Sequence, residues 1–269
     1  MSGECLTFLH SGDLGDFIAG LCSVKELCEK YGKKAIIIAD TSGGLKCNSE
    51  ALNKIVQMQT RGHGLKMNER GWNFIKPLVE FQPYVERTML LKEYSGTSVN
   101  YNLNWFRQKF NDKDAIKQTN QNLVFLHQMA CGLGYGYKGK WLECPDVPKS
   151  GKVVVARSTR YQSSHPIYEA MEKPLKEKGV FIGTSFELEV FKNCFGFAPE
   201  HHDVKDALEA AKEIKAAEAV VFNSTLFYWI AVGLGHPAIL HELPVDVPCS
   251  YFPNQIPFIK YFTGSHFVK

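Results

Sequence analysis

The chain has 269 residues, of which 45% are hydrophobic, 22% charged and 12% aromatic. These values are typical of a globular protein, so they exclude disorder, collagen and coiled coil as the overall class. The length allows one large domain or two small ones. The formal net charge of +3 is too small to indicate a nucleic-acid partner, although a local basic groove would not show in the total.

Targeting and metal signals are missing from the sequence. Residues 1–15 lack the basic and apolar regions of a signal peptide, and no apolar run approaches the ~20 residues that a membrane-spanning helix needs. We therefore expect a cytoplasmic protein with no transmembrane segment. The eight cysteines form no CxxC motif and no zinc-finger spacing with histidine, so we expect free thiols and no metal site.

The first half predicts a parallel α/β unit. Residues 6–9 are a short apolar run, residues 15–31 carry apolar side chains at helical spacing, and residues 35–40 are a β-branched run typical of a buried parallel strand. Strand, helix and strand within about 35 residues form a βαβ unit. Further helices are predicted at residues 51–58, 72–79 and 120–132, with a strand at 87–91.

The second half repeats this alternation after residues 132–152, a stretch rich in Gly, Pro and Lys that predicts a linker. Strands are predicted at residues 153–156, 180–182, 219–222 and 238–240, with helices at 166–178, 204–217 and 226–234. The predicted fold is α/β, with two Rossmann-like domains facing a cleft. Their expected bounds are residues 1–145 and 146–250, with residues 251–269 packing back on the first domain.

In parallel sheets, ligands bind beyond the carboxyl ends of the strands, and three predicted strand ends carry unusual residues. The first is the loop HSGDLGD at residues 10–16, where glycines permit a tight turn. Asp16 is a candidate general base for a hydroxyl nucleophile. The alternative is a capping pair for the following helix, with Asp13 as N-cap and Asp16 in the first turn. His10 and Asp13 are acceptor-side candidates.

The second loop, residues 156–166, combines two arginines with several hydroxyl side chains. Arg157, Ser158, Thr159 and Arg160 offer planar donors and hydroxyls that suit a pyrophosphate. The alternative is a solvated polar loop in which Arg160 forms a surface ion pair.

The third loop closes one predicted strand and opens a helix with Asn223, Ser224 and Thr225. Their side chains and the first N–H groups of the helix form a second candidate anion site. Simple N-capping by Ser224 or Thr225 is the alternative.

Taken in order, these loops resemble the glycosyltransferases of the GT-B fold, and above all family 9, the heptosyltransferase-like group. The sequence Leu14-Gly15-Asp16 is similar to that group's strand-end Gly-Asp, whose aspartate is the proposed catalytic base. Ser158-Thr159-Arg160 resembles its donor-phosphate loop. The run from Phe181 through Gly183 and Thr184, followed by Glu187, resembles the strand, glycine turn and acidic residue that contact the donor nucleoside.

Residues 223–237 resemble the family pattern N-D-S-G-P-x-H-L-A-A-A-L-G-x-P without gaps. Three positions depart from it, because Ser224, Leu226 and Trp229 stand where the family has aspartate, glycine and histidine. Those family residues help to hold the donor, so the resemblance leaves the donor sugar open.

The resemblance implies an inverting, metal-independent glycosyltransferase that uses a nucleotide-diphosphate sugar and no cofactor. Asp16 is then the catalytic base, and the acceptor is a glycan, a small molecule or a modified DNA base. Two alternatives remain: a non-catalytic nucleotide or nucleotide-sugar binding protein, and a nucleotide-sugar epimerase of the same fold. The expected donor-binding residues are Gly15, Arg157, Ser158, Thr159, Arg160, Gly183, Thr184, Glu187, Asn223, Ser224 and Thr225.

Overall fold

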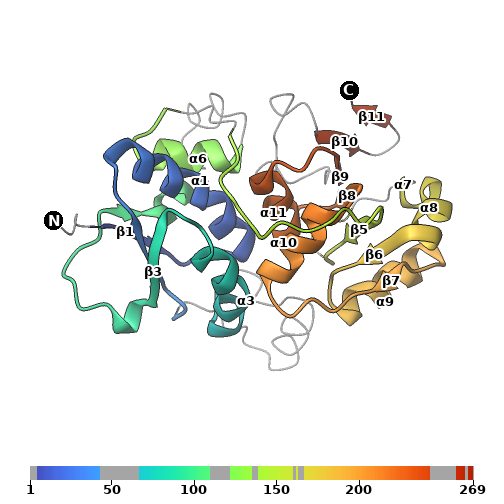
Figure 1. Ribbon diagram of the computed structural model, residues 1–269, viewed down its shortest axis with the longest axis horizontal. Helices are drawn as coiled ribbons and strands as arrows, with labels where there is room; N and C mark the ends of the chain where they lie inside the picture. The colour runs from blue at the N-terminus through green and yellow to red at the C-terminus, as the bar shows by residue number, and fades with distance from the viewer. Residues whose placement is uncertain are drawn as a thin grey trace.

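The computed structural model describes residues 5–42, 67–109, 122–134, 139–159, 162, 167–242, 259–263 and 266–268. Two α/β units lie side by side (Figure 1), each with its own sheet. The helix expected at residues 51–58 lies outside the described residues. Within them, no helix combines the length and the apolar character needed to cross a bilayer. Six of the eight cysteines are described, all as free thiols.

The first unit contains a parallel sheet in the order β3-β2-β1-β4. The predicted βαβ unit is confirmed as β1 (Leu6–His10), α1 (Leu14–Tyr31) and β2 (Ala35–Ala39). Helix α1 is buried on all sides from Phe17 to Val24, and it ends at Gly32, which takes the left-handed conformation at φ 61°. The remaining elements are α3 (Glu69–Glu80), β3 (Val85–Leu90), η1 (Leu91–Glu93), β4 (Tyr101–Asn102), η2 (Leu103–Trp105), α4 (Phe106–Lys109) and α6 (Leu123–Ala130).

The second unit contains a larger sheet in the order β11-β10-β9-β8-β5-β6-β7. All neighbouring strands run parallel except β10 and β11. Its strands are β5 (Val153–Ala156), β6 (Gly179–Phe181), β7 (Glu200–His201), β8 (Ala219–Phe222), β9 (Ile239–Glu242), β10 (Ile259–Thr263) and β11 (His266–Val268). Its helices are α7 (Ile167–Ala170), α8 (Glu172–Lys178), α9 (Ser185–Phe195), α10 (Ala207–Ala216) and α11 (Leu226–Leu234).

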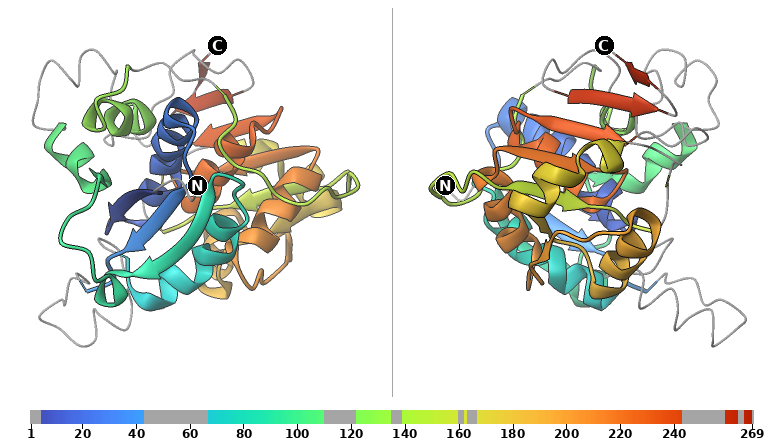
Figure 2. Two further views of the ribbon diagram at one scale, coloured as in Figure 1. Left: turned by 60° about the vertical axis from the view of Figure 1, so that its left-hand side comes forward. Right: turned by 90° about the vertical axis from the view of Figure 1, so that its right-hand side faces the viewer.

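The carboxyl-terminal strands belong to the second unit. The pairing of β10 with β9 extends that sheet, and the right-hand view of Figure 2 shows β10 and β11 at its edge. These two strands of the segment 251–269 are therefore part of the second sheet. The reason is that β9 offers a free edge for backbone hydrogen bonding, which a parallel strand completes.

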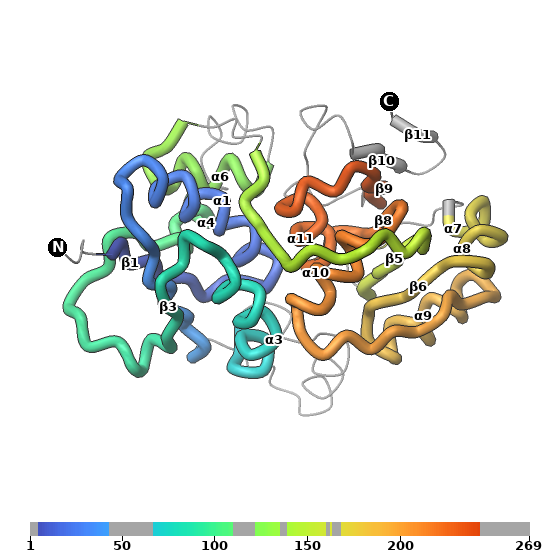
Figure 3. The backbone as a smooth tube through the Cα atoms, viewed as in Figure 1, coloured from blue at the N-terminus to red at the C-terminus, as the bar shows by residue number. Residues whose placement is uncertain are grey.

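The two units share one continuous hydrophobic core. Helix α1 packs against α11, and α3 packs against α10. The expected linker runs along this seam (Figure 3). The backbone N–H groups of Trp141 and Leu142 both donate to the carbonyl of Gly233 at 3.0 Å, and the indole of Trp141 donates to the carbonyl of Ile18 at 2.9 Å. The segment therefore joins the units by buried contacts as well as by chain continuity.

Candidate active site

The strand-end loop of the first unit meets the strand-end helix of the second. A Cβ atom on Gly15 would lie only 2.9 Å from Cδ1 of Trp229 and 3.9 Å from the Cα atom of Leu226. Real Cβ atoms do not approach aromatic carbons so closely, so the close packing of α1 on α11 depends on glycine here. The first turn of α1, which carries Asp16, consequently lies beside the first turn of α11.

Asp16 forms an ion pair with a residue that the sequence did not single out. Oδ2 of Asp16 lies 2.7 Å from Nη2 of Arg107 in α4, and their side chains are 20% and 49% exposed. Asn104 holds α4 in place, since its Oδ1 accepts hydrogen bonds from the backbone N–H and the hydroxyl of Ser11 at 2.9 and 3.0 Å. The Asp16 carboxylate is therefore partly exposed to solvent and forms an ion pair with α4, which is itself held against the loop after β1.

Asp13 occupies the N-cap position of α1, as expected, but its side chain makes no capping hydrogen bond. The prediction that this side chain caps the helix is therefore wrong. Its backbone carbonyl still begins the helix by accepting a hydrogen bond from the N–H of Phe17 at 2.9 Å.

His10, an acceptor-side candidate, lies at the end of β1 inside the core and is fully buried. Its Nδ1 accepts a hydrogen bond from the backbone N–H of Gly12 at 2.8 Å. Its ring lies 4.9 Å from that of Phe17 and 5.5 Å from that of His127, between centroids. Burial, assisted by the nearby charge of Arg107, lowers the pKa of His10 to about 3. The ring is thus a neutral part of the core behind Asp16.

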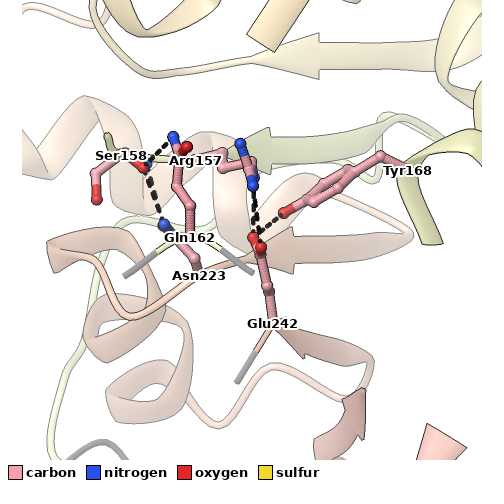
Figure 4. Close-up of polar contacts among 6 residues, drawn as sticks. All are labelled: Arg157, Ser158, Gln162, Tyr168, Asn223 and Glu242. Atoms are coloured by element: carbon pink, nitrogen blue, oxygen red, sulfur yellow. Dashed lines mark hydrogen bonds and ion pairs between the residues drawn. The ribbon is translucent and has the colours of Figure 1, made fainter. Parts of the chain in front are cut away.

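The loops after β5 and β8 are joined to each other at the carboxyl edge of the second sheet (Figure 4). The buried side chain of Asn223 accepts a hydrogen bond from the N–H of Ser158 at 3.1 Å and donates to its carbonyl at 3.0 Å. The amide of Gln162 donates to the same carbonyl at 3.0 Å. Ser158 and Thr159 are half-buried, whereas Arg160 lies outside the described residues.

Arg157 turns into the protein beneath this edge (Figure 4). Its Nε and Nη2 atoms donate to the two carboxylate oxygens of Glu242 at 3.0 and 3.2 Å, and the hydroxyl of Tyr168 donates to Glu242 at 3.1 Å. The side chains of Arg157 and Glu242 are 3% and 0% exposed. Burial opposes the charged form of Arg157, but Glu242, together with Tyr168 and Cys194, keeps the pKa of the guanidinium above its usual range. The structure thus gives Arg157 a buried carboxylate as partner.

Helix α11 presents its amino-terminal end at the same edge. Thr225 is its N-cap, and its hydroxyl accepts a hydrogen bond from the N–H of Tyr228 at 3.4 Å, so N-capping by Thr225 is confirmed. A hydrogen bond of 3.2 Å joins Oγ of Ser224 to Nε2 of His241. Ser224, Thr225 and Leu226 are all half-buried. The remaining N–H groups of the first turn have no acceptor within the helix, which is the arrangement that attracts an anion.

The turn after β6 uses its polar residues to begin α9. Thr184 and Glu187 form a capping box, in which the hydroxyl of Thr184 accepts from the N–H of Glu187 at 3.2 Å and Glu187 accepts from the N–H of Thr184 at 2.8 Å. A Cβ atom on Gly183 would lie 2.4 Å from the ring of Phe181, so this turn needs glycine.

Among the described residues, no group of three or more His, Cys, Asp or Glu side chains is arranged to hold a metal ion.

Comparison with known proteins gives no sequence match, because no protein-family model and no curated protein matches the chain. Solved structures do match. The chain superposes on the E. coli heptosyltransferase WaaC bound to ADP with a TM-score of 0.56 and 10% identity, covering 97% of this chain and 93% of that one. The fold is that of the family 9 glycosyltransferases.

Two further structures agree. The family 9 glycosyltransferase from Veillonella parvula matches with a TM-score of 0.52 and 10% identity, over 99% of this chain and 87% of that one. The dodecameric, iron-containing glycosyltransferase TibC from enterotoxigenic E. coli matches with a TM-score of 0.56 and 12% identity, over 95% of this chain. The chain spans 61% of the length of TibC. At such identities the likeness establishes the fold, and activity has to be argued from the residues of this chain.

Proposed function

We propose that this chain is an inverting, metal-independent glycosyltransferase that moves a sugar from a nucleotide-diphosphate sugar to a hydroxyl acceptor. The observation that carries the proposal is the close contact between Gly15 and Trp229, which places the first turn of α1, with Asp16 next in sequence, beside the first turn of α11. A carboxylate on the first unit and the amino-terminal end of a helix on the second unit then belong to neighbouring turns. That is the pairing that a base and a departing diphosphate require.

On the donor side, the diphosphate binds at the first turn of α11. The helix supplies N–H groups and the positive end of its dipole, and Ser224 and Ser158 supply hydroxyls from two loops that Asn223 ties together. Arg160, in the same loop, adds a guanidinium to the diphosphate. These groups stabilise the charge on the leaving diphosphate by fixed donors, the role that a metal ion fills in other transferases. ADP and ADP-heptose occupy structures of the matched glycosyltransferases, so ADP-sugars are the first donors to test.

On the acceptor side, Asp16 removes the proton from the accepting hydroxyl as its oxygen attacks the anomeric carbon. The bond between that carbon and the diphosphate oxygen breaks in the same step, and the diphosphate leaves with the bonding electron pair. A single displacement from the face opposite the leaving group inverts the anomeric configuration. Asp16 suits this role because its carboxylate is partly exposed and directly follows Gly15, the residue of α1 that contacts α11.

The test is release of nucleotide diphosphate from a panel of sugar nucleotides, with candidate hydroxyl acceptors and a metal chelator present. We expect release only when donor and acceptor are both added, and proton NMR of the product to show an inverted anomeric carbon. Binding of the donor without release under all conditions would contradict catalysis and identify a binding protein. Conversion or hydrolysis of the donor that does not depend on an acceptor would identify an epimerase or hydrolase.

A further inference from the structure

We infer that Arg107 is a positioning residue for Asp16, which it keeps ionised and fixed in one orientation at the mouth of the site. The role of this ion pair in catalysis rests on the proposed function, whereas the ion pair itself does not. The ion pair itself, 2.7 Å between Nη2 and Oδ2, joins residues 91 positions apart. It links the first turn of α1 to α4, a helix that carries no other part of the site described above.

The segment that presents Arg107 is docked firmly. Leu103 and Phe106 are each 1% exposed and anchor the two sides of the turn, and Asn104 binds both polar groups of Ser11. The burial of Phe106 and the hydrogen bonds of Asn104 restrain the backbone that carries Arg107. The position of Arg107 is therefore set by the fold, and does not depend on its own long side chain alone.

The guanidinium is further constrained by an aromatic face. Its central carbon lies 5.1 Å from the ring centroid of Phe106, and that ring in turn packs 4.1 Å from the ring of His127. A cation over an aromatic face gains electrostatic attraction, and it gives up some rotamer freedom before it meets its partner. This distinguishes the pair from an ordinary surface ion pair, in which two unsupported side chains must both be ordered.

Arg107 is a cation in direct hydrogen-bonding contact with the Asp16 carboxylate. Asp13 is the other carboxylate of the same loop, and Lys109 is the other cation of α4. His10 in β1 and His127 in α6 are neutral. Burial is the largest cause of the lowered pKa of His127, and the charge of Arg107 lowers it further. Burial and a neighbouring carboxylate favour protonated Asp16, whereas Arg107 in contact favours the ionised form.

A general base that is already ionised and aimed needs no rearrangement when the acceptor arrives. Without Arg107, the half-buried carboxylate would hold its proton to higher pH and would be free to rotate away from the cleft. The expected consequence is a transfer rate whose acidic limb shifts to higher pH, with little change in donor binding. The pair also contributes little to folding, because both groups are partly exposed.

The test is a carbon-13 NMR titration of the Asp16 carboxyl group in the full chain, assigned by comparison with Asp16→Asn. In Arg107→Met we expect the pKa of Asp16 to rise by about one unit or more, and in Arg107→Lys to return most of the way to the wild-type value. Lys92→Met is the matched control, because Lys92 forms an ion pair of the same 2.7 Å length with Glu69 away from the site. This control should leave Asp16 unchanged. Thermal unfolding of each variant verifies that the fold is intact.

An Asp16 pKa in Arg107→Met within about 0.3 units of wild type would overturn the inference, whatever the activity. A raised pKa accompanied by an equal shift in the acidic limb of kcat/KM supports both the inference and the proposed function. A raised pKa in a protein that transfers no sugar from any donor supports the positioning of Asp16 by Arg107 and contradicts the proposed function. The two claims can therefore fail separately.

Discussion

Replacing Arg157 by methionine should destabilise the protein strongly, because it leaves the Glu242 carboxylate buried without its guanidinium. Glu242 is completely buried and accepts two hydrogen bonds from Arg157, with a third from Tyr168. Removing one partner of such a pair typically costs about 3–5 kcal/mol of unfolding free energy. Loss of the guanidinium contacts with the rings of Tyr168 and Phe195, at 5.5 and 5.1 Å, adds to this cost.

The assay is urea unfolding of Arg157→Met, Glu242→Leu and the double variant, with calorimetry of donor binding on each folded protein. If the pair is structural, Arg157→Met lowers the unfolding free energy by the stated amount, and the double variant recovers most of it because a well-packed apolar pair replaces the ions. A loss below about 1 kcal/mol in Arg157→Met, together with a large loss of donor affinity, would refute this reasoning. It would return Arg157 to the donor-binding role expected from the sequence.

Three further predictions follow from individual contacts. Gly15→Val should force α1 and α11 apart, because a Cβ atom alone would lie 2.9 Å from Trp229. We expect a loss of about 1–3 kcal/mol in unfolding free energy, and an unchanged melting curve would contradict the close packing. Thr184→Ala should cost ~1 kcal/mol through the lost capping box without changing donor affinity, and weakened binding at unchanged stability would instead make Thr184 a donor contact. His10 should make the unfolding free energy fall as the pH drops from about 6.5 toward 3. The histidine of the unfolded chain binds a proton in this range, whereas the buried ring, with a pKa of about 3, stays neutral. His10→Phe should flatten that dependence by up to about 1.4 kcal/mol per pH unit, and an equal slope in both proteins would show that His10 titrates normally.

The local pattern of apolar residues in the sequence was sufficient to predict most of the fold. The β-branched run of β2 and the apolar spacing of α1 and α11 identified elements whose bounds match the structure closely. Helix α9 was not predicted because its buried face is narrow. Its capping box, Thr184 followed three residues later by Glu187, is nevertheless visible in the sequence. The two-residue strands β4 and β7 are too short to show an alternation.

The site was only partly predictable, because its side chains are paired over long distances in the chain. The loop at residues 10–16 pointed to Asp16, but nothing near it indicated Arg107, which lies 91 positions away. The loop after β5 contained two arginines, and the sequence did not show that Arg157 turns inward. The partner of Arg157 is Glu242, 85 positions further along, and a carboxylate at the end of β9 becomes relevant only once the sheet order places β9 two strands from β5.

The central claim is that Asp16 acts as a base opposite a donor held at the end of α11. The measurement that tests it most directly is the turnover of Asp16→Asn relative to wild type, with donor affinity determined by calorimetry on the same preparation. The amide keeps the shape of the side chain and cannot take up a proton at neutral pH. We predict a turnover lower by roughly 10²–10⁴-fold at unchanged donor affinity. Near-normal turnover in this variant would contradict the account.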